Sequence, residues 1–333
     1  MSKINTAVVG ATGAVGRQML KILEEKEFPV GKLKLFATEK SKGKKLKFQS
    51  KNYEVDTIKK GSFSDIDIAL FSIGSTPSKK IAPQAAEEGA VVIDNSNAFR
   101  MDEEVPLVVP EINPEEIKNN NGIIANPNCS TIQMVLALKP IYEEAGIKRI
   151  VVSTYQAVSG TGKKAIDELK EQVKAYVNGN ELKSEVYPHQ IAFNVLPHID
   201  VFFENGYTKE ELKLVRETKK ILNDSQIAIS STAARIPVFY GHAESINVET
   251  EQKLEVDRLK ELLNSTEGVE VVDDPENSSY PLPINSEHND KVMVGRIRED
   301  FSIKNGINMW VVANNLRKGA ALNAVQIAEK IIN

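Results

Sequence analysis

Residues 4–17 read Ile-Asn-Thr-Ala-Val-Val-Gly-Ala-Thr-Gly-Ala-Val-Gly-Arg, and this stretch decides the fold class. The apolar run Ile4–Val9 predicts a buried β-strand. Apolar residues then recur with helical spacing, which predicts a helix over Ala14–Lys26. Between them lies a turn with glycines at positions 10, 13 and 16. A strand, a glycine turn and a helix in this order are typical of the first unit of a dinucleotide-binding domain.

The glycine turn has the chemistry that a pyrophosphate needs. Small residues let the backbone come close to the phosphates, and the free N–H groups at the helix start favour negative charge. We therefore expect cofactor contacts from Gly10, Thr12, Gly13, Ala14, Val15 and Gly16. The spacing is Gly-x-x-Gly-x-x-Gly rather than the commoner Gly-x-Gly-x-x-Gly, so the turn predicts a dinucleotide only together with its strand and helix.

The turn after the next predicted strand, Leu33–Ala37, bears on the choice of cofactor. An acidic residue in this place favours NAD, because it binds the ribose hydroxyls. Here the turn reads Thr38-Glu39-Lys40-Ser41, in which hydroxyl and basic side chains surround one acid. Thr38, Lys40 and Ser41 could hold a 2′-phosphate, whereas Glu39 argues against it. We expect NADP.

The remainder of the first third continues the alternation of strands and helices. The pattern predicts a helix over Ser78–Glu88 and strands over Asp67–Ser72, Ala90–Asp94 and Gly122–Ala125. Such alternation indicates a doubly wound parallel sheet with right-handed crossovers. The short basic stretch from Lys40 to Lys51 is expected to be a solvated loop.

The pattern changes after residue 126, and extended segments dominate from residue 226 onward. This mixture indicates an α+β second domain. Asn277–His288, rich in Pro, Ser and Asn, is expected to be an ordered surface loop. Helices are predicted over Thr131–Ala145, Ala165–Asn178, Lys209–Leu222, Glu251–Leu263 and Ala320–Ile332. Strands are predicted over Lys148–Ala157, Gln226–Ala233, His242–Val248, Val269–Val272, Lys291–Arg298 and Ile307–Val312.

Composition excludes several classes of protein. The 333 residues are enough for about two domains at the usual size. With 42 basic and 46 acidic residues the net charge is −4, so no global field favours nucleic acid. No apolar run approaches the roughly 20 residues of a membrane span, and the N-terminus does not resemble a signal peptide. A single cysteine excludes an intramolecular disulfide framework. We expect a cytoplasmic protein that binds neither nucleic acid nor membranes.

That cysteine is the strongest catalytic candidate. Cys129 lies in Asn126-Pro127-Asn128-Cys129-Ser130-Thr131, between a predicted strand and a predicted helix. A helix N-terminus stabilises a thiolate, and its amides can bind an oxyanion. We interpret Cys129 as a nucleophile rather than as a small buried hydrophobe. Beside a nicotinamide, a thiol can add to an aldehyde, lose hydride and form a thioester that phosphate or water cleaves. In reverse, an acyl phosphate acylates the thiol and NADPH reduces the thioester.

Both directions need a general acid–base near the sulfur. Of the four histidines, His189, His198 and His288 fit loops or core, whereas His242 follows a glycine in Phe239-Tyr240-Gly241-His242. Seven residues earlier, Arg235 lies in an apolar run, where an unpaired cation would be costly. A guanidinium–carboxylate clamp is the natural use of such an arginine.

Four motifs in this order resemble the bacterial aspartate-β-semialdehyde dehydrogenases along nearly the whole chain. They are residues 10–16 (Gly-Ala-Thr-Gly-Ala-Val-Gly), 126–131 (Asn-Pro-Asn-Cys-Ser-Thr), 154–160 (Thr-Tyr-Gln-Ala-Val-Ser-Gly) and 235–242 (Arg-Ile-Pro-Val-Phe-Tyr-Gly-His). The resemblance implies the reaction L-aspartate 4-semialdehyde + phosphate + NADP⁺ ⇌ 4-phospho-L-aspartate + NADPH. In the reductive direction it feeds synthesis of lysine through diaminopimelate, and of threonine, methionine and isoleucine.

The resemblance also implies an architecture of the semialdehyde/glyceraldehyde-3-phosphate dehydrogenase type. Residues 1–127 and 316–333 would form a Rossmann-type NADP-binding domain, and residues 128–315 a catalytic and dimerisation domain. The protein would be a homodimer or a homotetramer and would need no metal. Its partners would be small molecules, namely aspartyl phosphate, aspartate semialdehyde and phosphate.

Residue roles follow from the same resemblance. Cys129 would form the thioester, His242 would be the acid–base and Gln156 would orient the intermediate. Arg235 would bind the substrate α-carboxylate, and Arg100, Asn128 and Lys213 the phosphate. Glu210 would hold the substrate amine, although Glu217 and Lys220 form a rival Glu-x-x-Lys pair. Further cofactor contacts are expected from Ser72, Gly74, Ser159, Gly160 and Asn315.

Two other functions compete with this one. N-acetyl-γ-glutamyl-phosphate reductases share the chemistry but typically have Tyr-Pro-Thr after the cysteine, where this chain has Ser130-Thr131-Ile132. The cysteine motif of glyceraldehyde-3-phosphate dehydrogenase differs as well. A non-catalytic redox sensor that binds NADP would need only the glycine turn. It would have no use for the substrate clamp at Arg235.

Overall fold

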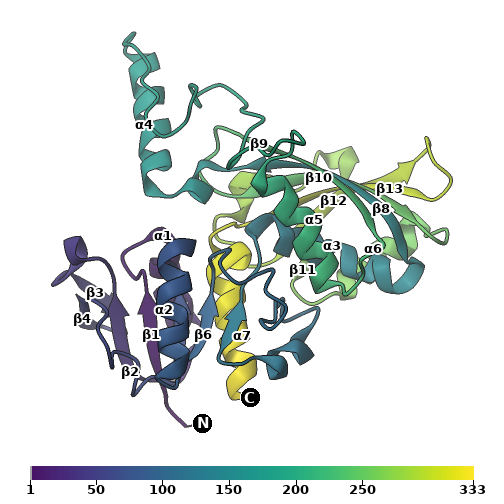
Figure 1. Cartoon of the computed structure of the whole chain (residues 1–333). Coiled ribbons are helices and arrows are strands. Elements are labelled where there is room, and N and C mark those ends of the chain that lie inside the picture. Colours follow the sequence, from purple (N-terminus) through teal and green to yellow (C-terminus); the bar gives the residue numbers. More distant parts are fainter. Residues whose placement is uncertain (1) are drawn as a thin grey trace. The chain divides into compact units, whose positions relative to one another are not determined.

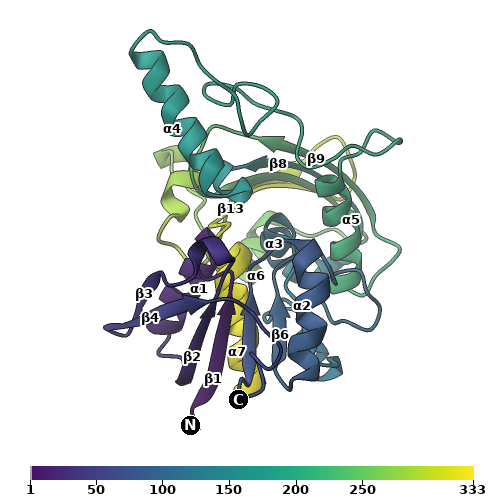
Figure 2. The same cartoon turned by 60° about the vertical axis from the view of Figure 1, so that its left-hand side comes forward.

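The computed structural model describes residues 2–333. Its internal contacts divide the chain into two compact units, Met1–Asn128 with Ala320–Asn333, and Cys129–Gly319 (Figures 1 and 2). The C-terminal helix α7 (Leu322–Ile332) therefore belongs to the first unit. It follows a π-helical turn, Arg317–Ala321.

The first unit is built on a seven-stranded sheet in the order β3-β4-β2-β1-β5-β6-β7. Helices α1 (Ala14–Glu25) and α7 pack against each other, and α2 (Ser75–Glu87) packs on β5, β6 and β7. Short 3₁₀ turns are η1 (Glu39–Ser41) and η2 (Pro114–Asn119). The strands are β1 (Ile4–Val9), β2 (Val30–Phe36), β3 (Lys45–Phe48), β4 (Lys51–Asp56), β5 (Ile68–Phe71), β6 (Val91–Asp94) and β7 (Ile123–Ala125).

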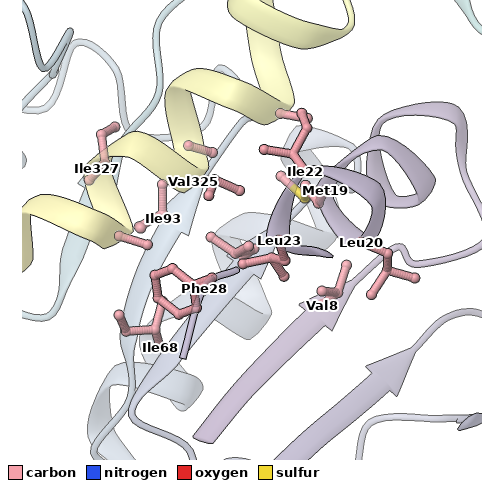
Figure 3. Packing of buried hydrophobic residues seen from close by; sticks show 14 of the residues in the cluster. Val8, Met19, Leu20, Ile22, Leu23, Phe28, Ile68, Ile93, Val325 and Ile327 are labelled. Atoms are coloured by element: carbon pink, nitrogen blue, oxygen red, sulfur yellow. The ribbon is translucent and has the colours of Figure 1, made fainter. Parts of the chain in front are cut away.

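The core of this unit lies where apolar residues of the central strands meet those of the covering helices. Val8, Ile68 and Ile93 project from three neighbouring parallel strands (Figure 3). They meet Leu23 of α1 and Val325 of α7, all of them less than 3% exposed. Burial of this apolar surface is the main driving force that holds the helices on the sheet.

The expected doubly wound sheet is confirmed, but the prediction of a solvated loop over Lys40–Lys51 is wrong. The segment contains β3, which pairs antiparallel with β4 in register Lys45↔Glu54 to Phe48↔Lys51. Leu46 and Phe48 are buried, while Lys45 and Lys47, which alternate with them, are exposed. The lysine-rich composition hid the two-residue period of this edge strand.

The second unit contains a six-stranded mixed sheet in the order β11-β12-β13-β10-β8-β9. Pairs β8·β9 and β11·β12 are parallel, and the other neighbours are antiparallel. The strands are β8 (Ile147–Gln156), β9 (Ala228–Arg235), β10 (His242–Thr250), β11 (Val269–Val271), β12 (Val292–Asp300) and β13 (Gly306–Ala313).

Helices α3 (Cys129–Ala145), α5 (Lys209–Ile221) and α6 (Val256–Ser265) pack on this sheet, whereas α4 (Lys163–Val177) packs on the 3₁₀ turn η3 (Val158–Thr161) (Figure 1). α6 begins five residues later than predicted, because the N–H groups of Glu251 and Gln252 donate to the carbonyls of Gly146 and Ala145 instead of starting the helix. The expected loop 277–288 contains the 3₁₀ turn η5 (Pro283–Ser286), and η4 (Pro275–Asn277) ends at its start. No helix within residues 2–333 is long and apolar enough to cross a membrane.

Candidate active site

Three predicted site residues meet at one edge of the second sheet because of strand direction. β8 and β9 run parallel and end together, with Gln156 paired with Arg235. β10 is antiparallel to β8, and its Ala243 pairs with Tyr155. The start of β10, at His242, therefore lies beside the ends of β8 and β9. Residues far apart in the chain are brought together by the sheet itself, which is a rigid support for a site.

His242 is fully buried and held in one tautomer. The backbone N–H of Ala157 donates to its Nδ1 at 3.0 Å. Because Nδ1 accepts, the proton of the neutral ring belongs on Nε2. Burial and then the neighbouring Arg235 lower the pKa of His242 from 6.5 to about 3, against an opposing effect of Glu210. Within residues 2–333, Nε2 has no hydrogen-bond partner. The ring is thus a neutral hydrogen-bond donor with its donor atom unused.

Arg235 and Gly160 lie next to that donor. Arg235 Nη1 donates to the Ala157 carbonyl at 2.7 Å, and its Nε has no partner in the described chain. A Cβ on Gly160 would stand 3.0 Å from Arg235 Nη1 and 3.2 Å from His242 Nε2. The absence of a side chain at residue 160 therefore leaves room at the two atoms that could bind a ligand.

A second chain of contacts joins Gln156 to helix α5. Gln156 Nε2 donates to Glu210 Oε1 at 3.1 Å, and Lys213 Nζ donates to Glu210 Oε2 at 2.8 Å. Lys213 also pairs with Asp200 at 3.0 Å. Burial acts to lower the pKa of Lys213, but Glu210 and Asp200 outweigh it and raise that pKa, so the ammonium is charged. This contact with Gln156 distinguishes Glu210 from the rival Glu217.

The N-terminus of helix α5, which carries Glu210, is fixed by a capping box. Thr208 and Glu211 form a capping box, in which the Thr208 side chain accepts from the Glu211 N–H and the Glu211 carboxylate accepts from the Thr208 N–H. Such a box satisfies two N–H groups that a helix start otherwise leaves free. The first turn that carries Glu210 is therefore fixed in place.

Cys129 is the first residue of α3 and is partly exposed. The 17-residue helix places its positive end at the sulfur. A Cβ on Gly319 would come within 2.9 Å of the Cys129 Cβ, so the π-helical turn packs directly against the cysteine backbone. Cys129 thus occupies the position that the sequence predicts, at the start of a helix.

In the first unit, asparagines fix the loop that leads toward Cys129. Asn126 donates from Nδ2 to Asn95 Oδ1 at 2.9 Å and accepts at Oδ1 from Asn323 of α7 at 2.7 Å. Arg100 donates from Nε to the Asn126 carbonyl at 2.9 Å and from Nη2 to the Asn95 carbonyl at 2.8 Å. Arg100 is 7% exposed, so it is a structured group rather than a solvated surface charge.

Arg100, Asn128 and Lys213 do not form one cluster within a single unit. Arg100 and Asn128 belong to the first unit, and Lys213 belongs to the second. Asn128 is the last residue of its unit and is buried. The predicted phosphate ligands therefore belong to different units.

The predicted cofactor residues of the first unit gather at the carboxyl ends of β2, β1 and β5, which are neighbours in the sheet. Gly10 has φ +84°, and a Cβ there would lie 2.2 Å from the Ser72 carbonyl oxygen. Helices α1 and α2 have Gly13 and Gly74 as N-caps, with no side-chain cap and no acid in the first turn. Two uncapped helix starts beside close-packed backbone fit a pyrophosphate.

The turn expected to recognise a 2′-phosphate is the 3₁₀ turn η1, with Thr38 as its N-cap. Thr38 and Lys40 are exposed, whereas Ser41 is buried and accepts from Thr12 Oγ1 at 3.4 Å. Ser41 thus links this turn to the glycine turn. Glu39 is exposed as well, so both kinds of charge are available there.

The remaining cofactor candidates lie in the second unit. Asn315 Nδ2 donates to Ser159 Oγ at 3.0 Å, and Asn315 Oδ1 accepts from the Gly241 N–H at 3.0 Å. Asn315 therefore fixes both η3, which contains Gly160, and the residue before His242. Gly74 and Ser72, in contrast, belong to the first unit.

Three contributors to the site are not apparent from the sequence pattern. Ala157 acts through its backbone, which no motif reveals, and Asn323 is distant from the site in sequence. Glu244, two residues after His242, is a fully buried carboxyl. A glutamate two residues after the candidate acid–base, on the same face of a predicted strand, was the signal that could have identified it. In the described part of the chain, no group of three or more His, Cys, Asp or Glu side chains could hold a metal ion.

Known families match the chain in two parts. Residues 5–120 match "Semialdehyde dehydrogenase, NAD binding domain", and residues 138–318 match "Semialdehyde dehydrogenase, dimerisation domain". An aspartate-semialdehyde dehydrogenase of Aquifex aeolicus is 60% identical over 98% of this chain and 97% of its own length. Aspartate-semialdehyde dehydrogenase 2 of Vibrio cholerae is 51% identical over 99% of this chain and 98% of its own.

Solved structures agree. Aspartate semialdehyde dehydrogenase II of Vibrio cholerae, complexed with ASA, superposes with a TM-score of 0.97 at 50% identity, over 100% of this chain and 99% of that one. The enzyme of Candida albicans with NADP superposes with a TM-score of 0.78 at 27% identity, over 99% of each chain. The expected Rossmann-type domain and α+β partner domain are thus confirmed. The chain belongs to the semialdehyde dehydrogenase family and, within it, to the aspartate-semialdehyde dehydrogenases.

Proposed function

We propose that this chain catalyses the NADPH-dependent reductive dephosphorylation of 4-phospho-L-aspartate to L-aspartate 4-semialdehyde, through a thioester on Cys129. The reaction is reversible and needs phosphate in the oxidative direction. The observation that carries the proposal is the meeting of Gln156, Arg235 and His242 at one sheet edge, in a chain 60% identical to an aspartate-semialdehyde dehydrogenase.

Substrate binding uses the charges described above. Arg235 binds the α-carboxylate. Its Nε has no hydrogen-bond partner within residues 2–333, and Gly160 leaves room beside its Nη1. Glu210, already in contact with Gln156, takes the α-amine. Arg100, Asn128 and Lys213 bind the phosphate. ASA is the ligand in the Vibrio cholerae structure, which supports this class of substrate.

Cys129 attacks the acyl carbonyl as the thiolate. A C–S bond forms, the C–O bond to the phosphoryl group breaks, and inorganic phosphate leaves. The start of α3 stabilises the thiolate before attack and supplies amides for the oxyanion that develops. Gln156 keeps the resulting thioester in place. In the oxidative direction phosphate attacks the same thioester.

His242 serves as the acid–base. Its Nδ1 is held by the Ala157 N–H, so Nε2 is the atom that donates a hydrogen bond or proton to the oxygen that gains negative charge. Deep burial keeps the ring neutral between turnovers. Gly160 leaves this atom accessible, because any larger residue would cover it.

When hydride has reached the thioester carbon, the C–S bond breaks, which releases L-aspartate 4-semialdehyde and returns the Cys129 thiolate. The cofactor would be NADP, which would supply that hydride when bound. Gly10, Thr12, Gly13, Ala14, Val15 and Gly16 would hold its pyrophosphate together with Ser72 and Gly74. Thr38, Lys40 and Ser41 would hold its 2′-phosphate, and Ser159, Gly160 and Asn315 would line the nicotinamide end. The NADP-bound relative from Candida albicans supports this choice over NAD.

In the cell, the product would enter lysine (diaminopimelate), threonine, methionine and isoleucine synthesis in the cytoplasm. The dimerisation domain supports a homodimer, or a homotetramer built from it. Residues 1–127 with 316–333 and residues 128–315 would be the functional domains.

The test is NADPH formation from aspartate semialdehyde, NADP⁺ and phosphate, with Cys129→Ala in parallel. We expect turnover that requires phosphate, prefers NADP⁺ to NAD⁺ and falls by about 10³-fold or more in Cys129→Ala. Folded wild-type protein without turnover would overturn the proposal. N-acetylglutamate semialdehyde is the control substrate, and preference for it would identify the other reductase.

A further inference from the structure

Glu244 is a buried carboxyl for which the proposed reaction has no use. It lies on β10 two residues after His242, so both side chains point to the same face of the strand, the face on which α3 packs. Its side chain is 0% exposed. In register across the sheet it faces Thr154 of β8 and Val311 of β13, neither of which carries a charge.

Within residues 2–333, no charged group contributes to the shifted pKa of Glu244. On β10 itself the neighbour is His242, which is neutral, and α3 begins at Cys129. Burial raises the pKa of the Glu244 carboxyl, and the smaller opposing effects come from Gln133 and Ser130 of α3, both uncharged. An ionised carboxylate buried without a cation is strongly unfavourable.

Three buried acceptor atoms, on Glu244 and Gln133, remain unsatisfied at this place. Within residues 2–333, neither carboxyl oxygen of Glu244 has a hydrogen-bond partner, and neither does Gln133 Oε1. Gln133 directs its Nε2 to the His242 carbonyl at 3.4 Å, which turns its Oε1 elsewhere. Buried acceptors without donors are rare, and each one costs free energy of folding. A protonated carboxyl contains an O–H donor, so one proton can satisfy Glu244 and Gln133 together.

We propose that Glu244 is a positioning residue that keeps a proton at neutral pH and, as a neutral acid, ties strand β10 to helix α3 through Gln133. Burial raises the pKa of Glu244 well above 4.5, in keeping with this. β10 begins at His242 and α3 begins at Cys129. The contact between Glu244 and Gln133 therefore fixes the position of the acid–base relative to the nucleophile. It also keeps a negative charge away from the thiolate. The roles of Cys129 and His242 in this inference rest on the proposed function.

Three variants separate the possibilities. Glu244→Gln keeps a neutral side chain with one donor and one acceptor, and we expect kcat and KM within about twofold of wild type. Glu244→Leu leaves Gln133 Oε1 without a donor, and we expect kcat to fall by about tenfold or more with KM little changed. Glu249→Gln, on the same strand but partly exposed, makes the same chemical change outside the contact and leaves both parameters unchanged.

The proton itself is visible by infrared spectroscopy, because a protonated carboxylic acid has a carbonyl band that a carboxylate lacks. We expect the wild-type spectrum at neutral pH to contain such a band, Glu249→Gln to keep it and Glu244→Gln to lose it. The free energy of unfolding gives a second readout. A folded pKa raised above 4.5 stabilises the fold at low pH, and this stabilisation is lost as the pH rises through the folded pKa. Glu244→Gln removes this loss of stability with rising pH.

The inference is overturned if the band is absent from wild type, or if Glu244→Gln is as impaired as Glu244→Leu, which would assign a role to the negative charge. Both spectroscopic and unfolding readouts are independent of turnover. A wild-type protein that shows the band but no activity would therefore refute the proposed function and leave the protonated Glu244 intact. If Glu244→Leu does not fold, the infrared band and the pH dependence of unfolding in wild type, Glu244→Gln and Glu249→Gln still decide whether Glu244 is protonated.

Discussion

Burial and neighbouring charges together determine which side chains of this site are charged. Lys213 stays charged because two carboxylates face it, whereas His242 is neutral because it is buried beside a guanidinium. The environment therefore shifts the two pKa values in opposite directions: it raises that of Lys213 and lowers that of His242. A cation is favoured at residue 213 and disfavoured at residue 242.

His242 makes the fold sensitive to acid. Its folded pKa of about 3 lies below the ordinary 6.5, so the unfolded chain binds the proton more tightly. The free energy of unfolding should be unaffected by this group above pH 6.5 and should fall as the pH drops from 6.5 toward about 3. Chemical denaturation across this range, with His242→Asn, measures it. We expect a shallower fall in the variant, and the exposed His189→Asn should behave as wild type. Equal slopes in all three would refute the assignment.

Arg235 offers a test of substrate recognition. Lysine in its place keeps the charge but loses the planar fork that grips a carboxylate. Loss of a charged hydrogen bond costs about 1.5–3 kcal/mol, or roughly 10–100-fold in kcat/KM for aspartate semialdehyde. Steady-state kinetics of Arg235→Lys measure this, with the Km for NADP⁺ as the internal control. An unchanged kcat/KM would show that Arg235 does not bind substrate.

The sequence pattern predicts Cys129 at the start of a helix, because strand, turn and helix are local signals. It could not reveal that Ala157 holds His242, since 85 residues separate them and the contact depends on strand register. It also could not choose between Glu210 and Glu217. Both fit a helix, and only the contact with Gln156 distinguishes them.

At the scale of elements, the 3₁₀ turn η3 is the most demanding part of the site. It follows β8 directly and places Gly160 against Arg235 and His242. Its backbone is tied through Ser159 to Asn315. The turn cannot move away from the site without breaking that contact.

Gly160→Ala should therefore damage catalysis more than stability. The new Cβ would stand 3.0–3.2 Å from Arg235 Nη1 and His242 Nε2, which forces both aside by a few tenths of an ångström. We expect kcat/KM to fall by about 10–100-fold, since small misplacements of reacting groups are costly. The midpoint of thermal unfolding should change little, because residue 160 has no positive φ. Wild-type kinetics in this variant would contradict the close packing.

Most elements followed from periodicity, and the exceptions have physical causes. The strand β3 was missed because its outward residues are lysines, so its composition resembled a loop. α6 was predicted too early because the polar end of β10 and the segment before the helix have no strong boundary signal. Strand order in the second sheet is set by contacts distant in sequence, which local patterns do not contain.

For the whole molecule, the open face of the second sheet is the feature that bears on assembly. Helices α3, α5 and α6 pack on the sheet, and Glu244 is buried on the face toward α3. Ser245 points the other way and is exposed. It pairs with Trp310 and with Ser153 in the middle of the sheet. A sheet face with a central tryptophan suits contact with a second copy of this chain.

Ser245→Arg should therefore weaken the proposed homodimer. A charge at the centre of this face would have to be buried without a partner in the assembled protein. Light scattering should give at least twice the mass of the chain for wild type and the mass of one chain for the variant at low concentration. An unchanged mass would place the contact elsewhere, and circular dichroism would confirm that the variant is folded.

The thioester on Cys129 is the core of the proposed mechanism, and a single-turnover experiment tests it. Excess aspartate semialdehyde and NADP⁺ are mixed with the enzyme in the absence of phosphate, and NADPH is followed over time. We predict a burst of NADPH equal to the number of active chains, a mass increase on the Cys129 peptide, and steady turnover once phosphate is added. Steady NADPH formation without a burst, or a burst that survives in Cys129→Ser, would contradict the mechanism.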